Sequence, residues 1–223
     1  MKPTVILATR SVGKLRELTA LCVAMNAPLL TLDDAKIAAS PEEAALENFD
    51  TFEANALAKA RWFHARRPDS LILADDSGLS VDALHGDPGV TSKRWSGRVD
   101  LEGAALDAAN NAHLQRQLDG AAREGRASRR AHYVCAAACV WATGESVVRA
   151  ETHGVILHSP NGDGGFGYDP YFFADDLGAT FAEVGRDEKA AVSHRGRAFT
   201  RLLDELHRLG VIDLRRAVDP RST

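Results

Sequence analysis

Residues 4–18 read TVILATRSVGKLREL, and this stretch decides the fold class. Thr4–Ala8 is a short apolar run rich in β-branched residues, which predicts a buried strand. A turn-like segment follows, and from Leu15 to Met25 apolar residues recur at helical spacing. A strand that leads directly into a helix is the building unit of α/β proteins. The start of the chain therefore predicts an α/β fold.

The rest of the chain extends this pattern. Short apolar runs predict strands at 29–32 and 71–74, and two longer strands near 131–142 and 146–157 are joined by a hairpin turn at 143–145. Helical patterns cover about 52–65, 101–118 and 197–209, and loops are expected at 40–50 and 159–170. Strand–helix alternation followed by a hairpin predicts a mixed sheet with flanking helices.

Size and composition narrow the class of protein. The chain has 223 residues, which suits one sizeable domain or two intimate lobes, and its net charge of −4 gives no general attraction to nucleic acid or membranes. No apolar run approaches the roughly 20 residues that span a bilayer, and the start of the chain does not read as a signal peptide. Cys22, Cys135 and Cys139 form no disulfide or metal-binding pattern. We therefore expect a cytoplasmic protein with buried cysteines.

The first candidate site is Thr9–Lys14, which follows a strand and opens a helix. Free N–H groups and the helix dipole attract phosphate at such a position, and Lys14 adds a full charge. The glycine spacing is not that of a Walker A loop. The competing interpretation is a plain helix cap with a solvated lysine.

The second candidate is Asp75-Asp76-Ser77-Gly78, directly after a predicted strand. Two adjacent carboxylates repel each other unless a cation or a proton intervenes, and Mg²⁺ prefers oxygen ligands of this kind. Gly78 is expected to permit a sharp turn. The competing interpretation is an Asx-turn at the end of the strand.

Two further candidates lie in the second half of the chain. In Gly164–Pro170 three glycines allow close approach to a ligand, and Phe166 and Tyr168 offer aromatic faces for a base. Downstream, Lys189 and Ser193-His194-Arg195-Gly196 supply donors for phosphate or a purine carbonyl. A surface loop and a helix cap are the respective alternatives.

The order of these segments resembles the inosine triphosphate pyrophosphatase family, also called dITP/XTP or noncanonical purine NTP pyrophosphatases. The matching pieces are VILATRSVGKLREL (5–18), TFEANALAKAR (51–61), LADDSGLSVDALHGDPGVTSKRWSG (73–97), GGFGYDPYFF (164–173) and EKAAVSHRGRA (188–198). The resemblance implies an elongated mixed β-sheet with flanking helices that form two lobes around a central nucleotide cleft. We therefore expect one two-lobed domain over residues 1–210 and a charged tail over 211–223.

The resemblance also implies an activity and its residues. The expected reaction is Mg²⁺-dependent hydrolysis of dITP, ITP or XTP to the monophosphate and pyrophosphate, by a homodimer that binds neither nucleic acid nor membranes. Asp76 is the implied catalytic acid, with Asp75 as a helper, and Asp76 and Glu47 are the implied metal ligands. The implied substrate contacts are Thr9, Arg10, Ser11, Val12, Gly13, Lys14, Ser77, Phe166, Gly167, Tyr168, Asp169, Lys189, His194 and Arg195.

The sequence departs from the family pattern at several positions. Arg10-Ser11 replaces the usual Gly-Asn, and Ala54 replaces a Glu. Glu47 is the best positional match for the acidic metal ligand, whereas Glu42-Glu43 is the closer match by pattern. Alternative functions are a pyrophosphatase for modified pyrimidine triphosphates and a nucleotide-binding regulator without turnover. A purely structural module does not explain four polar, glycine-containing segments in one family order.

Overall fold

The protein is described by a computed structural model that covers residues 4–25, 27 and 29–214. The elements in chain order are β1 (Thr4–Leu7), α1 (Val12–Ala24), β2 (Leu30–Thr31), the 3₁₀ helix η1 (Pro41–Ala45), α2 (Phe52–Arg66), β3 (Ser70–Val81), η2 (Asp82–Leu84), η3 (Gly89–Arg94), α3 (Gly103–Arg123), β4 (Arg130–Trp141), β5 (Gly144–Ile156), β6 (Phe172–Ala174), β7 (Ala179–Thr180), α4 (Arg186–Val192) and α5 (His194–Arg208).

One sheet joins the seven strands of the described residues, in the order β2-β1-β3-β4-β5-β6-β7. β1 pairs in parallel with β2 and β3, whereas β6 pairs antiparallel with β5 and β7. The predicted mixed sheet with flanking helices is therefore confirmed.

The chain divides into two compact units. Among the described residues, unit 1 comprises those from 4 to 76, from 136 to 149 and from 196 to 214, and unit 2 comprises those from 77 to 135 and from 150 to 195. Strands β3, β4 and β5 each contribute residues to both units.

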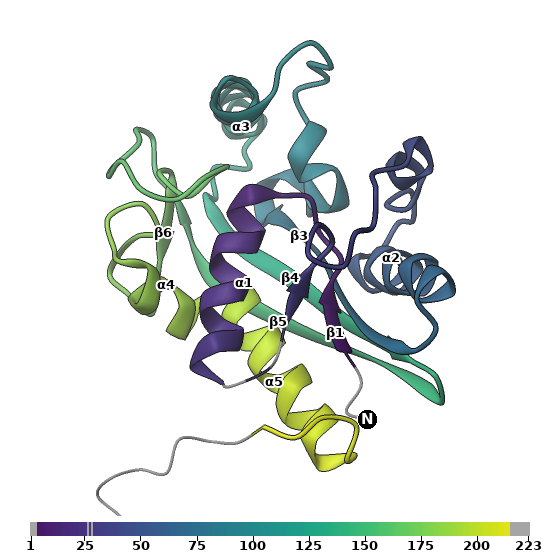
Figure 1. Ribbon diagram of the computed structural model, residues 1–223. Helices are drawn as coiled ribbons and strands as arrows, with labels where there is room; N and C mark the ends of the chain where they lie inside the picture. The colour runs from purple at the N-terminus through teal and green to yellow at the C-terminus, as the bar shows by residue number, and fades with distance from the viewer. Residues whose placement is uncertain (1–3, 26, 28, 215–223) are drawn as a thin grey trace, which may run out of the picture. The chain divides into compact units, whose positions relative to one another are not determined.

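In unit 1 the parallel strands fix the positions of two helices. Ile6 of β1 is in register with Leu30 of β2 on one side and with Ile72 of β3 on the other. Connections between parallel strands are right-handed, and the crossovers through α1 and α2 run in opposite directions across the sheet. The two helices consequently lie on opposite sides of these strands (Figure 1). Each helix begins at a hydroxyl cap, Ser11 for α1 and Thr51 for α2.

β3 is much longer than the sequence predicts. The strand was expected to end at Ala74, but it continues through Asp75, Asp76 and Gly78 to Val81. Gly78 accordingly lies inside a strand and not at a turn. Turn-forming residue types gave the wrong boundary because the two acids are buried and make polar contacts in the fold, which overrides their local preference.

Unit 2 is built around an apolar core that includes Leu79, Leu114, Tyr133, Phe172 and Phe181. Three of its elements, β6, β7 and α4, were not predicted. They span three, two and seven residues, which is too short for a periodic pattern to stand out.

The remaining expectations mostly hold. α1, α2, α3, α5 and the β4–β5 pair lie where the sequence predicts them, within a few residues. The expected loop at 40–50 contains the 3₁₀ helix η1, and all three cysteines are buried. No helix among the described residues is both long and apolar enough to cross a bilayer. Of the predicted tail, residues 215–223 lie outside the described residues.

Candidate functional site

The predicted phosphate loop forms a short connection between β1 and α1. Thr9 accepts a hydrogen bond from the Ser11 N–H at 3.2 Å, and the Ser11 hydroxyl accepts one from the Lys14 N–H at 3.4 Å. Val12 is exposed, and Gly13 is half-buried beside it. The connection therefore ends at the N-terminus of a 13-residue helix, where the dipole favours an anion.

The acids of β3 are surrounded by lysines from two helices. Lys14 Nζ lies 2.9 Å from Asp75 Oδ2, and Lys59 of α2 donates to the Asp75 carbonyl oxygen at 2.7 Å. Lys59 also forms an ion pair with Glu47. Asp75 is fully buried and Asp76 is 5% exposed. Alternating carboxylates and ammonium groups thus meet at one point of unit 1.

This environment shifts the pKa values of Asp76 and Glu47 in opposite directions. Burial raises the pKa of Asp76 to about 6; Lys14, Asn55 and Lys59 oppose this shift, whereas the neighbouring Glu47 charge adds to it. Burial also acts to raise the pKa of Glu47, but the charges of Lys59 and Lys14 outweigh it and lower that pKa. Asp76, unlike Glu47, can therefore exchange a proton near neutral pH.

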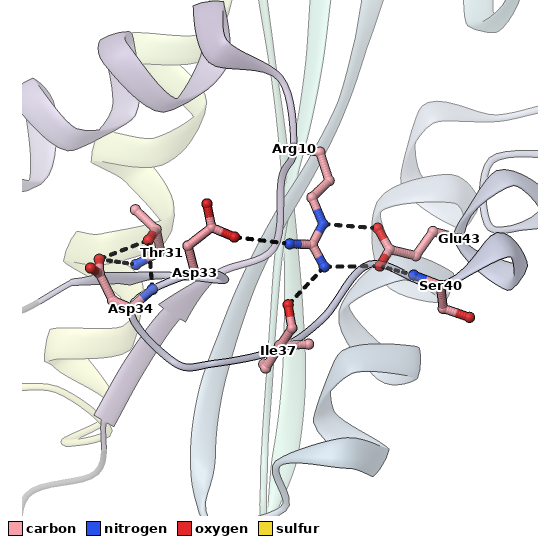
Figure 2. A network of polar contacts seen from close by, with 7 residues as sticks. All are labelled: Arg10, Thr31, Asp33, Asp34, Ile37, Ser40 and Glu43. Atoms are coloured by element: carbon pink, nitrogen blue, oxygen red, sulfur yellow. Dashed lines mark hydrogen bonds and ion pairs between the residues drawn. The ribbon is translucent and has the colours of Figure 1, made fainter.

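Arg10 takes up a different set of partners from its neighbours in the loop. Its guanidinium donates to both Glu43 carboxylate oxygens, at 3.2 and 3.0 Å, to Asp33 at 3.3 Å and to the Ile37 carbonyl at 3.0 Å (Figure 2). The same Glu43 accepts from the Ser40 N–H at 3.1 Å and so completes the cap of η1. Arg10 thereby links the loop between β1 and α1 to the segment that leads to α2.

The three candidate glutamates have distinct contacts. Glu43 is bound by Arg10, and Glu42 contacts Arg66 at 2.8 Å. Glu47 is the one of the three whose charge acts on Asp76. Of the three, Glu47 is thus the one found in the same charge cluster as Lys59 and Asp76.

In unit 2 the glycine-rich loop closes around Asp169. The Asp169 carboxylate accepts from the Phe166 N–H at 2.9 Å and lies 2.6 Å from Lys189 Nζ. Tyr133 of β4 donates to it at 3.5 Å. A Cβ on Gly165 would lie 2.3 Å from Asp169 Oδ2, so only glycine allows this approach. Asp169 thus positions a buried lysine.

The last predicted segment contributes two buried groups to the same unit. Arg195 donates to the Ser77 hydroxyl at 2.7 Å, and the His194 ring stacks on Tyr133 at a centroid distance of 4.5 Å. Lys189 and Arg195 lie 5.1 and 5.8 Å from the centroid of the half-buried Phe166 ring. Cations and an aromatic ring are therefore brought together in unit 2.

Tyr168 differs from the expectation for it. The sequence suggested an aromatic face for a base, but the side chain is 4% exposed and its hydroxyl donates to the Ser92 carbonyl at 2.8 Å. Its ring packs in the core because the loop turns inward at this residue. The adjacent Gly167 is held through its backbone by Asp107 and Asn111 at 2.8 Å each.

The predicted residues fall into two groups. Thr9 to Lys14, Glu47 and Asp76 belong to unit 1, and Ser77, Phe166 to Asp169, Lys189, His194 and Arg195 belong to unit 2. Sequence reasoning missed Asn55, Lys59 and Tyr133. Asn55 and Lys59 lie on the buried face of α2. The other buried residues of this face are Phe52, Ala56, Ala60 and Phe63. A polar residue that recurs at the helical spacing of an apolar face was therefore the sequence signal that could have identified Asn55 and Lys59.

The sequence profile of the Ham1 family matches residues 5–205. The chain belongs to the Ham1 family. A relative from Geobacter sulfurreducens named dITP/XTP pyrophosphatase is 45% identical over 207 residues, which cover 92% of this chain and 98% of the relative. A protein of the same name from Frankia alni is 47% identical over 198 residues, which cover 87% and 93% of the two chains.

Two solved structures have the same fold. A HAM1 protein from Coxiella burnetii matches with a TM-score of 0.76 at 30% identity, over 92% of this chain and 99% of that one. A nucleoside-triphosphatase / dITP/XTP pyrophosphatase from Mycobacterium abscessus matches with a TM-score of 0.65 at 40% identity, over 91% and 99%. The family resemblance stated from the sequence is thus confirmed.

Proposed function

We propose that this protein hydrolyses noncanonical purine nucleoside triphosphates, namely dITP, ITP and XTP, to the monophosphate and pyrophosphate. The observation that carries the proposal is the cluster around Asp76, in which a buried acid with a pKa of about 6 lies among Lys14, Lys59 and Glu47. The relatives named dITP/XTP pyrophosphatase support a pyrophosphatase reaction on dITP and XTP.

In this proposal unit 1 handles the triphosphate. The N-terminus of α1 and Lys14 offset the charge of the phosphates, including the charge that builds up on the departing pyrophosphate. Asp76 in its ionised form accepts a proton from the attacking water as the water approaches the α-phosphorus. Asp75, fixed by Lys14 and by the Lys59 contact with its carbonyl, holds the strand backbone beside this acid.

Mg²⁺ is the proposed cofactor, and the donor set fits it. Glu47 and Asp76 are hard oxygen donors whose mutual repulsion a cation would relieve. The described residues contain no group of three or more His, Cys, Asp or Glu that could hold a metal ion alone, and Mg²⁺ commonly uses one or two carboxylates together with water and phosphate oxygens. When bound, the ion supplies charge neutralisation for the triphosphate.

Unit 2 is proposed to recognise the base. A 6-keto purine presents an acceptor at position 6, where adenine presents an amino donor. Lys189 and Arg195 can only donate, so adenine would leave a buried donor unsatisfied at a cost of about 1–3 kcal/mol. Phe166 supplies an aromatic surface beside both cations.

Pyrophosphate release from dITP, ITP, XTP, GTP, ATP and dTTP, with Mg²⁺ and with a chelator, tests the proposal. Fast release from the first three nucleotides in the presence of Mg²⁺ is expected. Equal rates on GTP and ITP would contradict the selectivity, and preference for dTTP would favour the pyrimidine alternative. Tight ITP binding without turnover would favour a regulator. The homodimer implied by the resemblance is checked by sedimentation equilibrium.

A further inference from the structure

Asn55 is a fully buried amide on α2 that contacts two parts of the catalytic cluster at once. Its Oδ1 accepts from the Phe49 N–H at 2.8 Å, and its Nδ2 donates to the Phe49 carbonyl at 3.2 Å. The same Nδ2 donates to Asp76 Oδ2 at 2.8 Å. One side chain therefore joins the backbone next to Glu47 to the carboxylate of the proposed catalytic acid.

The partners of Asn55 define the orientation of its amide. The Phe49 N–H requires an acceptor, while the Phe49 carbonyl and the Asp76 carboxylate both require a donor. A reversed amide would place its oxygen against a carboxylate and its nitrogen against an N–H. All three contacts are consequently satisfied in one orientation only.

The segment that Asn55 holds has little apolar anchoring of its own. Glu47 is half-buried, Asn48 is exposed, and the Phe49 side chain is 51% exposed. Lys59, one helical turn after Asn55 and on the same face of α2, contacts Glu47 and the Asp75 carbonyl. α2 thus holds this segment against β3 at two points.

We propose that Asn55 is a positioning residue that sets the distance between the Glu47 and Asp76 carboxylates by fixing the Phe49 backbone and Asp76 together. This inference rests on the proposed function, because it assigns Asn55 a part in that reaction. Loss of such an outer contact typically costs about 10–100-fold in metal affinity or activity.

The test compares two variants that separate the contacts. Asn55→Leu removes all three hydrogen bonds, so amide exchange at Phe49 in metal-free protein should accelerate by about tenfold or more. Its kcat for dITP should fall about 10–100-fold, the Mg²⁺ concentration for half-maximal rate should rise, and the nucleotide KM should change little. Asn55→Asp keeps an acceptor for the Phe49 N–H but loses the donor to the Phe49 carbonyl and to Asp76 and places a second carboxylate beside Asp76. Its kcat should therefore fall while the Phe49 N–H stays protected.

Asn110→Leu is the matched control. Asn110 is also buried in a helix and also fixes a loop through the backbone, accepting from the Ser96 N–H at 2.9 Å and donating to the Lys93 carbonyl at 3.0 Å. Its loss should lower stability without raising the Mg²⁺ requirement.

Each result of these measurements either supports or overturns the role of Asn55. The inference is overturned if Phe49 exchanges rapidly in the wild type, if either Asn55 variant keeps wild-type kcat, or if Asn110→Leu reproduces the kcat loss and the Mg²⁺ shift. If Asn55→Leu does not fold, Asn55→Asp decides. A wild type that releases no pyrophosphate from any nucleotide refutes the proposed function, while the exchange measurement still shows whether Asn55 holds the segment.

Discussion

At the residue scale, the burial of Asp76 lowers the stability of the fold, and the same burial gives this acid the pKa that the proposed reaction uses. Its pKa is raised from 3.8 to about 6, with burial as the main cause, so the folded chain holds a proton that the unfolded chain has released between these two pH values. Stability from this group is therefore complete below pH 3.8 and is lost as the pH rises through 6. Above pH 6 the ionised Asp76 lowers the free energy of unfolding by about 1–3 kcal/mol.

Asp76→Asn should therefore separate stability from activity. In metal-free buffer at pH 8 the variant should gain about 1–3 kcal/mol of unfolding free energy over the wild type, because it carries no buried charge. The gain should disappear near pH 3.5, and turnover should be abolished at every pH. Urea unfolding at the two pH values measures the first effect; an equal difference at both would show that the charge of Asp76 is not the cause.

Gly165 and Gly167 form a natural pair for a second test at this scale. Both have positive φ, at 73° and 64°, but a Cβ at Gly165 would collide with Asp169, whereas one at Gly167 would meet nothing within 4 Å. Gly167→Ala should cost about 1–2 kcal/mol for backbone strain alone. Gly165→Ala should cost more and should raise the nucleotide KM about tenfold, because Asp169 no longer holds Lys189. Equal KM values for the two variants would refute this role.

At the scale of elements, Arg10 links the loop between β1 and α1 to the 3₁₀ helix η1 through its ion pair with Glu43. A double-mutant cycle of Arg10→Ala and Glu43→Ala should give a coupling energy of about 0.5–1.5 kcal/mol, which should decrease with added salt since both side chains are partly exposed. If Arg10 instead binds phosphate, Arg10→Ala should raise the nucleotide KM and show no coupling to Glu43. Thermal unfolding and steady-state kinetics of the four proteins distinguish the two cases.

Sequence patterns predict some of these elements and miss others. β1, α1 and α2 were predictable because their apolar spacing is regular. η1 was missed although Ser40 and Glu43 carry a capping-box signature. The inward turn of Tyr168 and the partners of Arg10 could not be predicted, because both depend on residues distant in the chain.

At the scale of the whole molecule, the cysteines report on how the two units unfold. Cys22 and Cys139 belong to unit 1 and Cys135 belongs to unit 2, and burial raises the pKa of Cys22 and Cys139 to about 12. Because β3, β4 and β5 run through both units, we expect one cooperative transition. Iodoacetamide labelling along a urea gradient, read by mass spectrometry, should give one midpoint for all three thiols; separate midpoints would mean independent unfolding.

β3 continues without a break through Asp75 and Asp76, so insertions and deletions within this strand would alter the candidate site. Side chains alternate between the two faces of a strand, so one inserted or deleted codon within residues 70–81 would turn every later side chain to the opposite face. The side chains of Asp76 and Ser77 would then each point to the opposite face of the sheet from the one they occupy now. We expect this stretch to accept some substitutions but no change in length, whereas the connections outside the sheet are where insertional engineering should begin.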